Sequence, residues 1–207
     1  MRCEALKILF IDICKNAGSS ISRGFRRKFP ELKAKGRHHS VRNFTAKGFD
    51  PEDGSIWKAT CDPVTEEDLN TYRTFAVIRN PYDRLVSLYL WGKMYNRHSF
   101  EKFIYNIKEN KYVEFNRHRY RTQLEWISDY DNNIRVQKLL RFESLNQDFY
   151  NLLKEWNIPQ YKLGKENAAE NHIGKKRKHY RDYYNPASRK MVEKIYAKDL
   201  EYFNYEY

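Results

Sequence analysis

The chain has 207 residues and a formal net charge of +12. This length is enough for one domain with a real core, and we expect a single domain over residues 1–207. Because no run of 18 apolar residues occurs in the sequence, we expect no membrane-spanning segment. The positive charge favours an anionic partner, such as nucleic acid, an acidic polysaccharide, anionic lipid or a nucleotide.

The cysteines and the first residues bear on the compartment. Cys3, Cys14 and Cys61 are scattered and lack the Cys-x-x-Cys spacing, which argues against a disulfide framework and against a zinc site. Glu4 and Lys7 interrupt the charge-then-apolar pattern that a signal peptide requires. We therefore expect a cytoplasmic protein with free thiols.

Apolar runs and helical spacings alternate along the chain. The patterns predict strands at 7–13, 36–42, 75–78 and 134–142, and helices at 18–28, 80–95, 99–108, 146–156 and 186–203. Residues 44–70 are predicted as loop and short elements, and residues 160–183 as a loop. Strands that alternate with helices indicate an α/β layered domain around a mostly parallel sheet, and in such sheets ligands bind at the carboxyl ends of the strands.

The first of two phosphate-binding signatures follows the strand predicted at 7–13. It reads Lys15-Asn16-Ala17-Gly18-Ser19-Ser20. Gly18 permits a tight turn and a close approach of the backbone to an anion, and the start of a helix suits phosphate or sulfate. Lys15 precedes the glycine, whereas the lysine of a Walker A loop follows it, so an ATP-hydrolysing enzyme is not favoured. A plain strand-to-helix turn is the alternative interpretation of this motif.

The second signature follows the strand predicted at 75–78 and is more specific. Arg79 ends the strand, where a guanidinium can hold phosphate through two parallel hydrogen bonds. Asn80 is a good N-cap for the next helix, and Ser87, two helical turns further on, returns to the same face. Asp83 and Arg84 are interpreted as structural, with Arg84 a surface cation. Two such turns on one sheet indicate a ligand with phosphate at both ends.

The two signatures resemble those of the cytosolic-fold sulfotransferases, in particular the carbohydrate (polysaccharide) branch. Four further segments are similar to family motifs in the same order, so the resemblance covers nearly the whole chain. They are His38-His39-Ser40-Val41-Arg42 (K-H-x-x-x-R), Arg121-Thr122-Gln123 (R-P-Q), Leu139–Leu145 (L-R-F-E-x-L) and the closing helix within Tyr180–Tyr205. Thr122, in place of proline, is the clearest departure from the family pattern.

This resemblance implies a three-layer α/β/α sandwich with a central, mostly parallel sheet, related to the P-loop nucleotide kinases. It implies a sulfotransferase that uses 3′-phosphoadenosine 5′-phosphosulfate (PAPS), with the first turn on the 5′-phosphosulfate and the second on the 3′-phosphate. The reaction would be a direct in-line displacement by an acceptor hydroxyl that leaves 3′-phosphoadenosine 5′-phosphate (PAP), without a metal.

The resemblance also implies roles for individual residues. Lys15 would stabilise the leaving 5′-phosphate, and His39 would act as the base, with His38 the alternative. A basic loop would supply a cation to the 3′-phosphate, from Lys175 or Arg177. The candidates for the acceptor side are Arg42, Arg119, Arg121 and Gln123.

The acceptor itself is not determined by the sequence. We expect a carbohydrate or another hydroxyl-bearing acceptor, and the basic charge favours an acidic glycan. A small-molecule or nucleotide kinase on a similar sheet is an alternative, as is a non-catalytic basic module that binds nucleic acid or acidic glycan. No nucleic-acid recognition motif stands out, so we expect no nucleic-acid partner.

Overall fold

The computed structural model describes residues 1–34, 40–42, 64–111, 117–164, 174 and 176–207. The chain divides into two compact units. Unit 1 comprises Met1–Ile78 and Gln123–Glu166, and unit 2 comprises Arg79–Thr122 and Asn167–Tyr207. The single domain expected over residues 1–207 stays a prediction.

Unit 1 is built on a four-stranded sheet of order β1-β2-β3-β4. The strands are β1 (Arg2–Cys3), β2 (Ile8–Ile11), β3 (Arg73–Ile78) and β4 (Lys138–Arg141). β1 is antiparallel to β2, whereas β2, β3 and β4 run parallel, with Phe10 opposite Phe75 and Ala76 opposite Leu139. The structure thus confirms the mixed α/β class and the mostly parallel sheet. β1 was not predicted, because two residues are too few to show a period.

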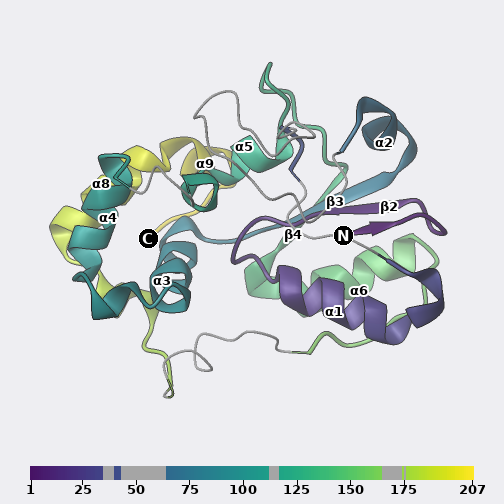
Figure 1. Ribbon diagram of the computed structural model, residues 1–207, viewed down its shortest axis with the longest axis horizontal. Coiled ribbons are helices and arrows are strands. Elements are labelled where there is room, and N and C mark those ends of the chain that lie inside the picture. The colour runs from purple at the N-terminus through teal and green to yellow at the C-terminus, as the bar shows by residue number, and fades with distance from the viewer. Residues whose placement is uncertain (35–39, 43–63, 112–116, 165–173, 175) are drawn as a thin grey trace. The chain divides into compact units, whose positions relative to one another are not determined.

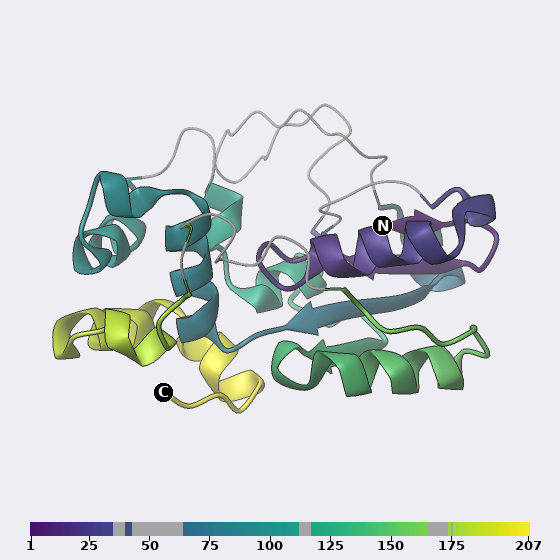
Figure 2. The same cartoon turned by 90° about the horizontal axis from the view of Figure 1, so that it is seen from below.

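Helices lie on both sides of this sheet. α1 (Gly18–Lys28) and α6 (Leu145–Glu155) cover one side together, as the two views show (Figures 1 and 2). α2 (Glu66–Thr71) and α5 (Gln123–Ile127) lie on the other side (Figure 1). Under α1 and α6, Phe10 of β2 stacks on Phe75 of β3 at 4.7 Å between ring centroids, and Phe25 and Phe149 come from the two helices. This buried aromatic cluster fixes the strands, and therefore the turns that follow them.

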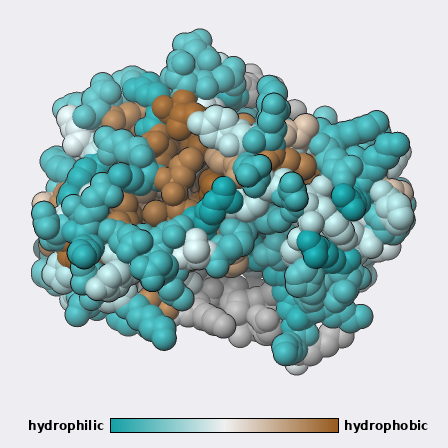
Figure 3. Space-filling view, turned by 180° about the vertical axis from the view of Figure 1, so that it is seen from behind, coloured by the Kyte–Doolittle hydropathy of each residue, from teal (hydrophilic) through white to brown (hydrophobic). Residues whose placement is uncertain are grey.

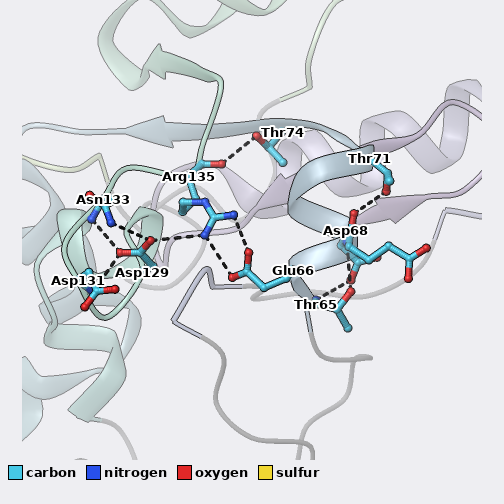
Figure 4. A network of polar contacts seen from close by, with 10 residues as sticks. Thr65, Glu66, Asp68, Thr71, Thr74, Asp129, Asp131, Asn133 and Arg135 are labelled. Carbon is cyan, nitrogen blue, oxygen red and sulfur yellow. Dashed lines mark hydrogen bonds and ion pairs between the residues drawn. The ribbon is translucent and has the colours of Figure 1, made fainter.

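A network of polar contacts orders the entry to β4 (Figure 4). Arg135 donates to Glu66 Oε2 at 2.7 Å and to Asp129 Oδ2 at 3.5 Å. Asp129 also accepts a hydrogen bond from the backbone N–H of Asn133 at 2.8 Å. Burial by itself would raise the pKa of Asp129, but the hydrogen bonds from Asn133 and Arg135 outweigh it and lower the pKa. The network joins the first turn of α2 to the segment between α5 and β4.

Unit 2 is helical in its described part. Its helices are α3 (Pro81–Trp91), α4 (Phe100–Lys108), α8 (Pro186–Ile195) and α9 (Ala197–Tyr202). α4 packs on α8, and the shared core includes Tyr82, Leu85, Phe103, Val192 and Tyr196. Short 3-10 helices occur in both units: Pro30–Leu32, Met94–Asn96, Arg117–Tyr120, Phe142–Ser144 and Tyr180–Tyr183.

Several predicted boundaries were wrong. The helix expected over 186–203 is two helices, which meet at Tyr196. α3 ends at Trp91 before Gly92 rather than near residue 95. Of the strand expected at 36–42, Ser40 to Arg42 are described and are not in a strand, and the remainder lies outside the described residues.

Most of the surface visible in Figure 3 is hydrophilic, and hydrophobic residues gather in one area at the upper left of the view. The hydrophilic part agrees with a charged-residue content of 32%. Within the described ranges, no helix has both the length and the apolar character needed to cross a membrane. The cytoplasmic setting expected from the sequence stays a prediction.

Candidate functional site

The first turn, between β2 and α1, contains two strained backbone positions. Lys15 has φ 70° and Ala17 has φ 65°, both in the left-handed region that favours glycine. Each such residue costs on the order of 1–3 kcal/mol and persists where the surrounding structure holds it. Left-handed residues next to helical ones are the backbone arrangement from which anion-binding nests are built, and the N–H of Asn16, between the two left-handed residues, donates to the carbonyl of Ile13 at 3.1 Å. Ala17 is also the N-cap of α1 and has no side-chain oxygen to cap the helix.

The space beside Gly18 is occupied by a side chain, and the expected role of Gly18 at an anion stays a prediction. The left-handed conformations belong to Lys15 and Ala17, so Gly18 is not needed for positive φ. A Cβ atom on Gly18 would lie 1.7 Å from Oδ1 of Asp12. Asp12 is a buried carboxylate at the end of β2. Glycine at position 18 leaves this carboxylate its place, because a Cβ atom there would force the Asp12 side chain to shift.

Asn16 joins three elements of unit 1. Its side chain is fully buried, and Nδ2 donates to the backbone carbonyl of Val77 at 2.7 Å and to Oε1 of Gln123 at 2.6 Å. Gln123 is also fully buried, at the start of α5. Asn16 was predicted to bind the nucleotide and Gln123 to bind the acceptor substrate, and the structure brings these two residues into contact. Together they hold the turn against β3 and α5. Their direct contact with a ligand stays a prediction.

The second turn places Arg79 beside a carboxylate. The Nε and Nη2 atoms of Arg79 donate to Oδ2 of Asp83 at 2.8 and 2.6 Å. Arg177 donates from Nη2 to Oδ1 of the same carboxylate. Burial alone would raise the pKa of Asp83, but attraction to Arg79 and Arg177 outweighs it, so that the pKa is lowered. Two arginines predicted for the 3′-phosphate, 98 positions apart in the sequence, are thus held by one anion.

The start of α3 is capped as predicted. Asn80 Oδ1 accepts from the backbone N–H of Tyr82 at 3.0 Å, and Pro81 has no N–H to offer. The first amides of this helix are therefore not its main donors to an anion, and the guanidinium groups have that capacity instead. Ser87 is buried on α3, two turns from Asn80.

Arg84 was predicted as a surface cation, and this is wrong. Its exposed fraction is 0%. The guanidinium donates to the backbone carbonyls of Arg121 and Arg119, each at 2.9 Å. α3 is buried around nearly its whole circumference, so an arginine on it must turn inward and find acceptors. The near-continuous apolar run that flanks Arg84 was the available signal.

The candidates for the acceptor side are distributed over both units. In unit 2, the Arg119 guanidinium lies 4.6 Å from the centre of the Trp91 ring, and Arg119 and Arg121 lie in the segment that Arg84 holds. In unit 1, Arg42 donates to Oδ1 of Asn132 at 2.7 Å. His38, His39 and Lys175 lie outside the described residues.

These turns define the class of protein: an α/β protein with left-handed backbone positions in its first strand-to-helix turn and two arginines paired with one carboxylate at the second. The chain matches the model of the Sulfotransferase family over residues 1–206, and it therefore belongs to the sulfotransferase family. The resemblance drawn from the two signatures is confirmed at the level of the family, which implies transfer of a sulfuryl group to a hydroxyl-bearing acceptor. No curated protein and no solved structure matches the chain.

Proposed function

We propose that the protein transfers a sulfuryl group from PAPS to a hydroxyl group of a carbohydrate by direct in-line displacement, on a three-layer fold related to the P-loop nucleotide kinases. The observation that carries the proposal is the pair of guanidinium groups, Arg79 and Arg177, held around one carboxylate. A place that binds a carboxylate between two arginines has the charge and the donors that a phosphate group requires.

The residues present fit PAPS. In addition to its contacts with Asp83, Arg177 has a buried Nε atom that finds no hydrogen-bond partner among the described residues. A buried donor without a partner is costly, and a phosphate oxygen would satisfy it. Arg79, Ser87 and Arg177 or Lys175 would hold the 3′-phosphate. The residues of the first turn would hold the 5′-phosphosulfate: Lys15, Asn16, Ala17, Gly18, Ser19 and Ser20.

PAPS, when bound, supplies the sulfuryl group and leaves as PAP. The Lys15 ammonium stabilises negative charge at the 5′-phosphate, because a fixed cation acts where charge develops. His39 accepts the proton of the acceptor hydroxyl, since a neutral imidazole near pH 7 is a suitable base. Arg42, Arg119 and Arg121 attract an acidic acceptor. The proposed transfer uses no metal.

Thermal unfolding with and without PAP tests the donor, with ADP plus Mg²⁺ as the control. A ligand that binds only the native state adds about 2.7 kcal/mol at roughly 100 times its dissociation constant. We expect a rise in Tm with PAP and none with ADP and Mg²⁺. A rise only with ADP and Mg²⁺ would favour a kinase, and no rise with either would favour a non-catalytic basic module.

Transfer of radiolabelled sulfate from PAPS to a panel of neutral and acidic glycans tests the reaction and its acceptor. Lys15→Ala and His39→Ala should each reduce the transfer rate by at least about a hundredfold, the usual contribution of a general base or of a charge-stabilising group. Full transfer by both variants would show that these two residues do not carry the chemistry.

A further inference from the structure

Asp83 is the point at which the two arginines of the second turn meet. It lies in the first turn of α3, four residues after Arg79, while Arg177 reaches it from 94 residues further along the chain. Each guanidinium has its own carboxylate oxygen: Arg79 binds Oδ2 and Arg177 binds Oδ1. Arg177 also donates to the backbone carbonyl of Asp83 at 3.4 Å. One residue therefore contacts both cations.

The contacts fix orientation as well as position. A guanidinium is a planar fork with five N–H donors. Asp83 accepts from Nε and Nη2 of Arg79 through one oxygen, which fixes the plane of that fork. The side chains of Arg79 and Arg177 are largely buried, with exposed fractions of 6% and 13%. Arginine side chains have many rotamers in water, and a ligand that meets already ordered ones does not have to order them.

The charge of Asp83 has two opposing effects on an incoming phosphate. Its carboxylate repels the phosphate, but the cluster of two guanidinium groups and one carboxylate still carries a net charge of +1. Without the carboxylate, two like charges at close range would repel each other. They would move apart, and Arg177 would lose its ion pair with the carboxylate of residue 83. We expect the loss of positioning to exceed the relief of repulsion.

We propose that Asp83 is a positioning residue that sets Arg79 and Arg177 for a 3′-phosphate, and so gives the protein its selectivity for a 3′-phosphorylated nucleotide. The proposal rests on the proposed function, because it takes PAP as the product that the two arginines bind. On this proposal, a change at Asp83 weakens the binding of a nucleotide that has a 3′-phosphate. It leaves the binding of a nucleotide without that phosphate unchanged.

The experiment is calorimetric titration of the full chain with PAP and with adenosine 5′-phosphate, which differ only by the 3′-phosphate. The quantity compared is the dissociation constant of adenosine 5′-phosphate divided by that of PAP, so that a large ratio means a preference for the 3′-phosphate. Asp83→Asn should reduce this ratio by about tenfold or more, because one hydrogen bond between charged groups contributes at least that factor. Glu201→Gln removes a carboxylate from an exposed position on α9 of the same unit and should leave the ratio unchanged.

Asp83→Glu is the conservative variant. It keeps the charge and moves the carboxylate by one methylene group, so the variant should fold. Its ratio of dissociation constants should fall by less than that of Asp83→Asn. If the asparagine variant does not fold, a several-fold reduction of the ratio in Asp83→Glu supports the proposal, and an unchanged ratio overturns it. A purely structural role would weaken binding of both nucleotides equally and leave the ratio unchanged.

The outcomes distinguish failure of the proposed function from failure of the positioning role of Asp83. If the wild-type protein binds PAP no more tightly than adenosine 5′-phosphate, the proposed function fails. If it prefers PAP and Asp83→Asn keeps that preference, only the positioning role is overturned. An increased preference in Asp83→Asn would also overturn it, because repulsion by the carboxylate would then outweigh positioning.

Discussion

Asn16→Asp is the most informative single substitution in the first turn. The side chain of Asn16 is fully buried, and its Nδ2 donates to two oxygens, Val77 O at 2.7 Å and Gln123 Oε1 at 2.6 Å. The introduced carboxyl group has nearly the same shape but has two donors fewer when ionised. A buried carboxylate that faces two oxygens is disfavoured both by desolvation and by repulsion, so the pKa of the introduced group is raised in the folded state.

The magnitude follows from the two hydrogen bonds and the raised pKa. At low pH the protonated group still donates one hydrogen bond, so the loss of stability is about 1 kcal/mol. A group whose pKa is raised on folding loses stability as the pH rises from its unfolded value, near 3.9, to its folded value, at about 1.4 kcal/mol per unit. With a rise of roughly three units, typical of a buried carboxyl group, the further loss is about 4 kcal/mol at neutral pH.

Urea unfolding of the wild type and of Asn16→Asp between pH 4 and pH 8 measures this difference. We expect the difference in unfolding free energy to be small at pH 4 and to grow until about pH 7. Asn146→Asp, at an exposed position in the first turn of α6, is the matched control and should show no such loss. A constant difference over this range would refute the reasoning, because Asn16 would then not face two acceptors in a buried place.

Two further substitutions test the packing of the turns. Gly18→Ala places a Cβ atom 1.7 Å from Asp12 Oδ1 and should cost about 1–3 kcal/mol of unfolding free energy. In the control Gly24→Ala, in the same helix, the new Cβ atom lies 3.3 Å from its nearest neighbour, so this variant should be close to neutral. Equal losses of stability in the two variants would contradict the Asp12 contact. Arg84→Met removes two hydrogen bonds from a buried cation to backbone carbonyls and should cost about 3 kcal/mol in chemical unfolding. The control Lys190→Met, at an exposed position of α8, should change the unfolding free energy by less than about 0.5 kcal/mol. An equally small change in Arg84→Met would show that the buried guanidinium does not hold the segment of Arg119 and Arg121.

The elements that position the site could be predicted because their signals are local. The apolar run before Lys15 and the i,i+4 spacing of Ile21 and Phe25 indicate a strand followed by a helix, and the structure has β2 and α1 there. Asn80 and Pro81 mark a helix start, and α3 begins at Pro81 with Asn80 as its cap. Such patterns depend on neighbouring residues, so they can be recognised without knowledge of distant contacts.

Some boundaries were not predictable from the same signals. The spacing of apolar residues continues across Tyr196, yet the helix breaks there into α8 and α9. The aromatic ring of Tyr196 is buried, and its hydroxyl donates to the carbonyl of Tyr120. A contact over 76 residues is not visible in a local pattern.

The sequence by itself determined the mixed α/β class with its mostly parallel sheet, and two strand-to-helix turns that resemble those of the sulfotransferase family. Only the tertiary structure decided which side chains meet in those turns: Asn16 with Gln123 over 107 residues, and Asp83 with Arg177 over 94. It also decided that Arg84 is buried and holds a segment of backbone. The physical reason is that propensity, capping and periodicity act over one or two turns of chain, whereas the partner of a buried polar group is set by the packing of segments that are distant in the sequence.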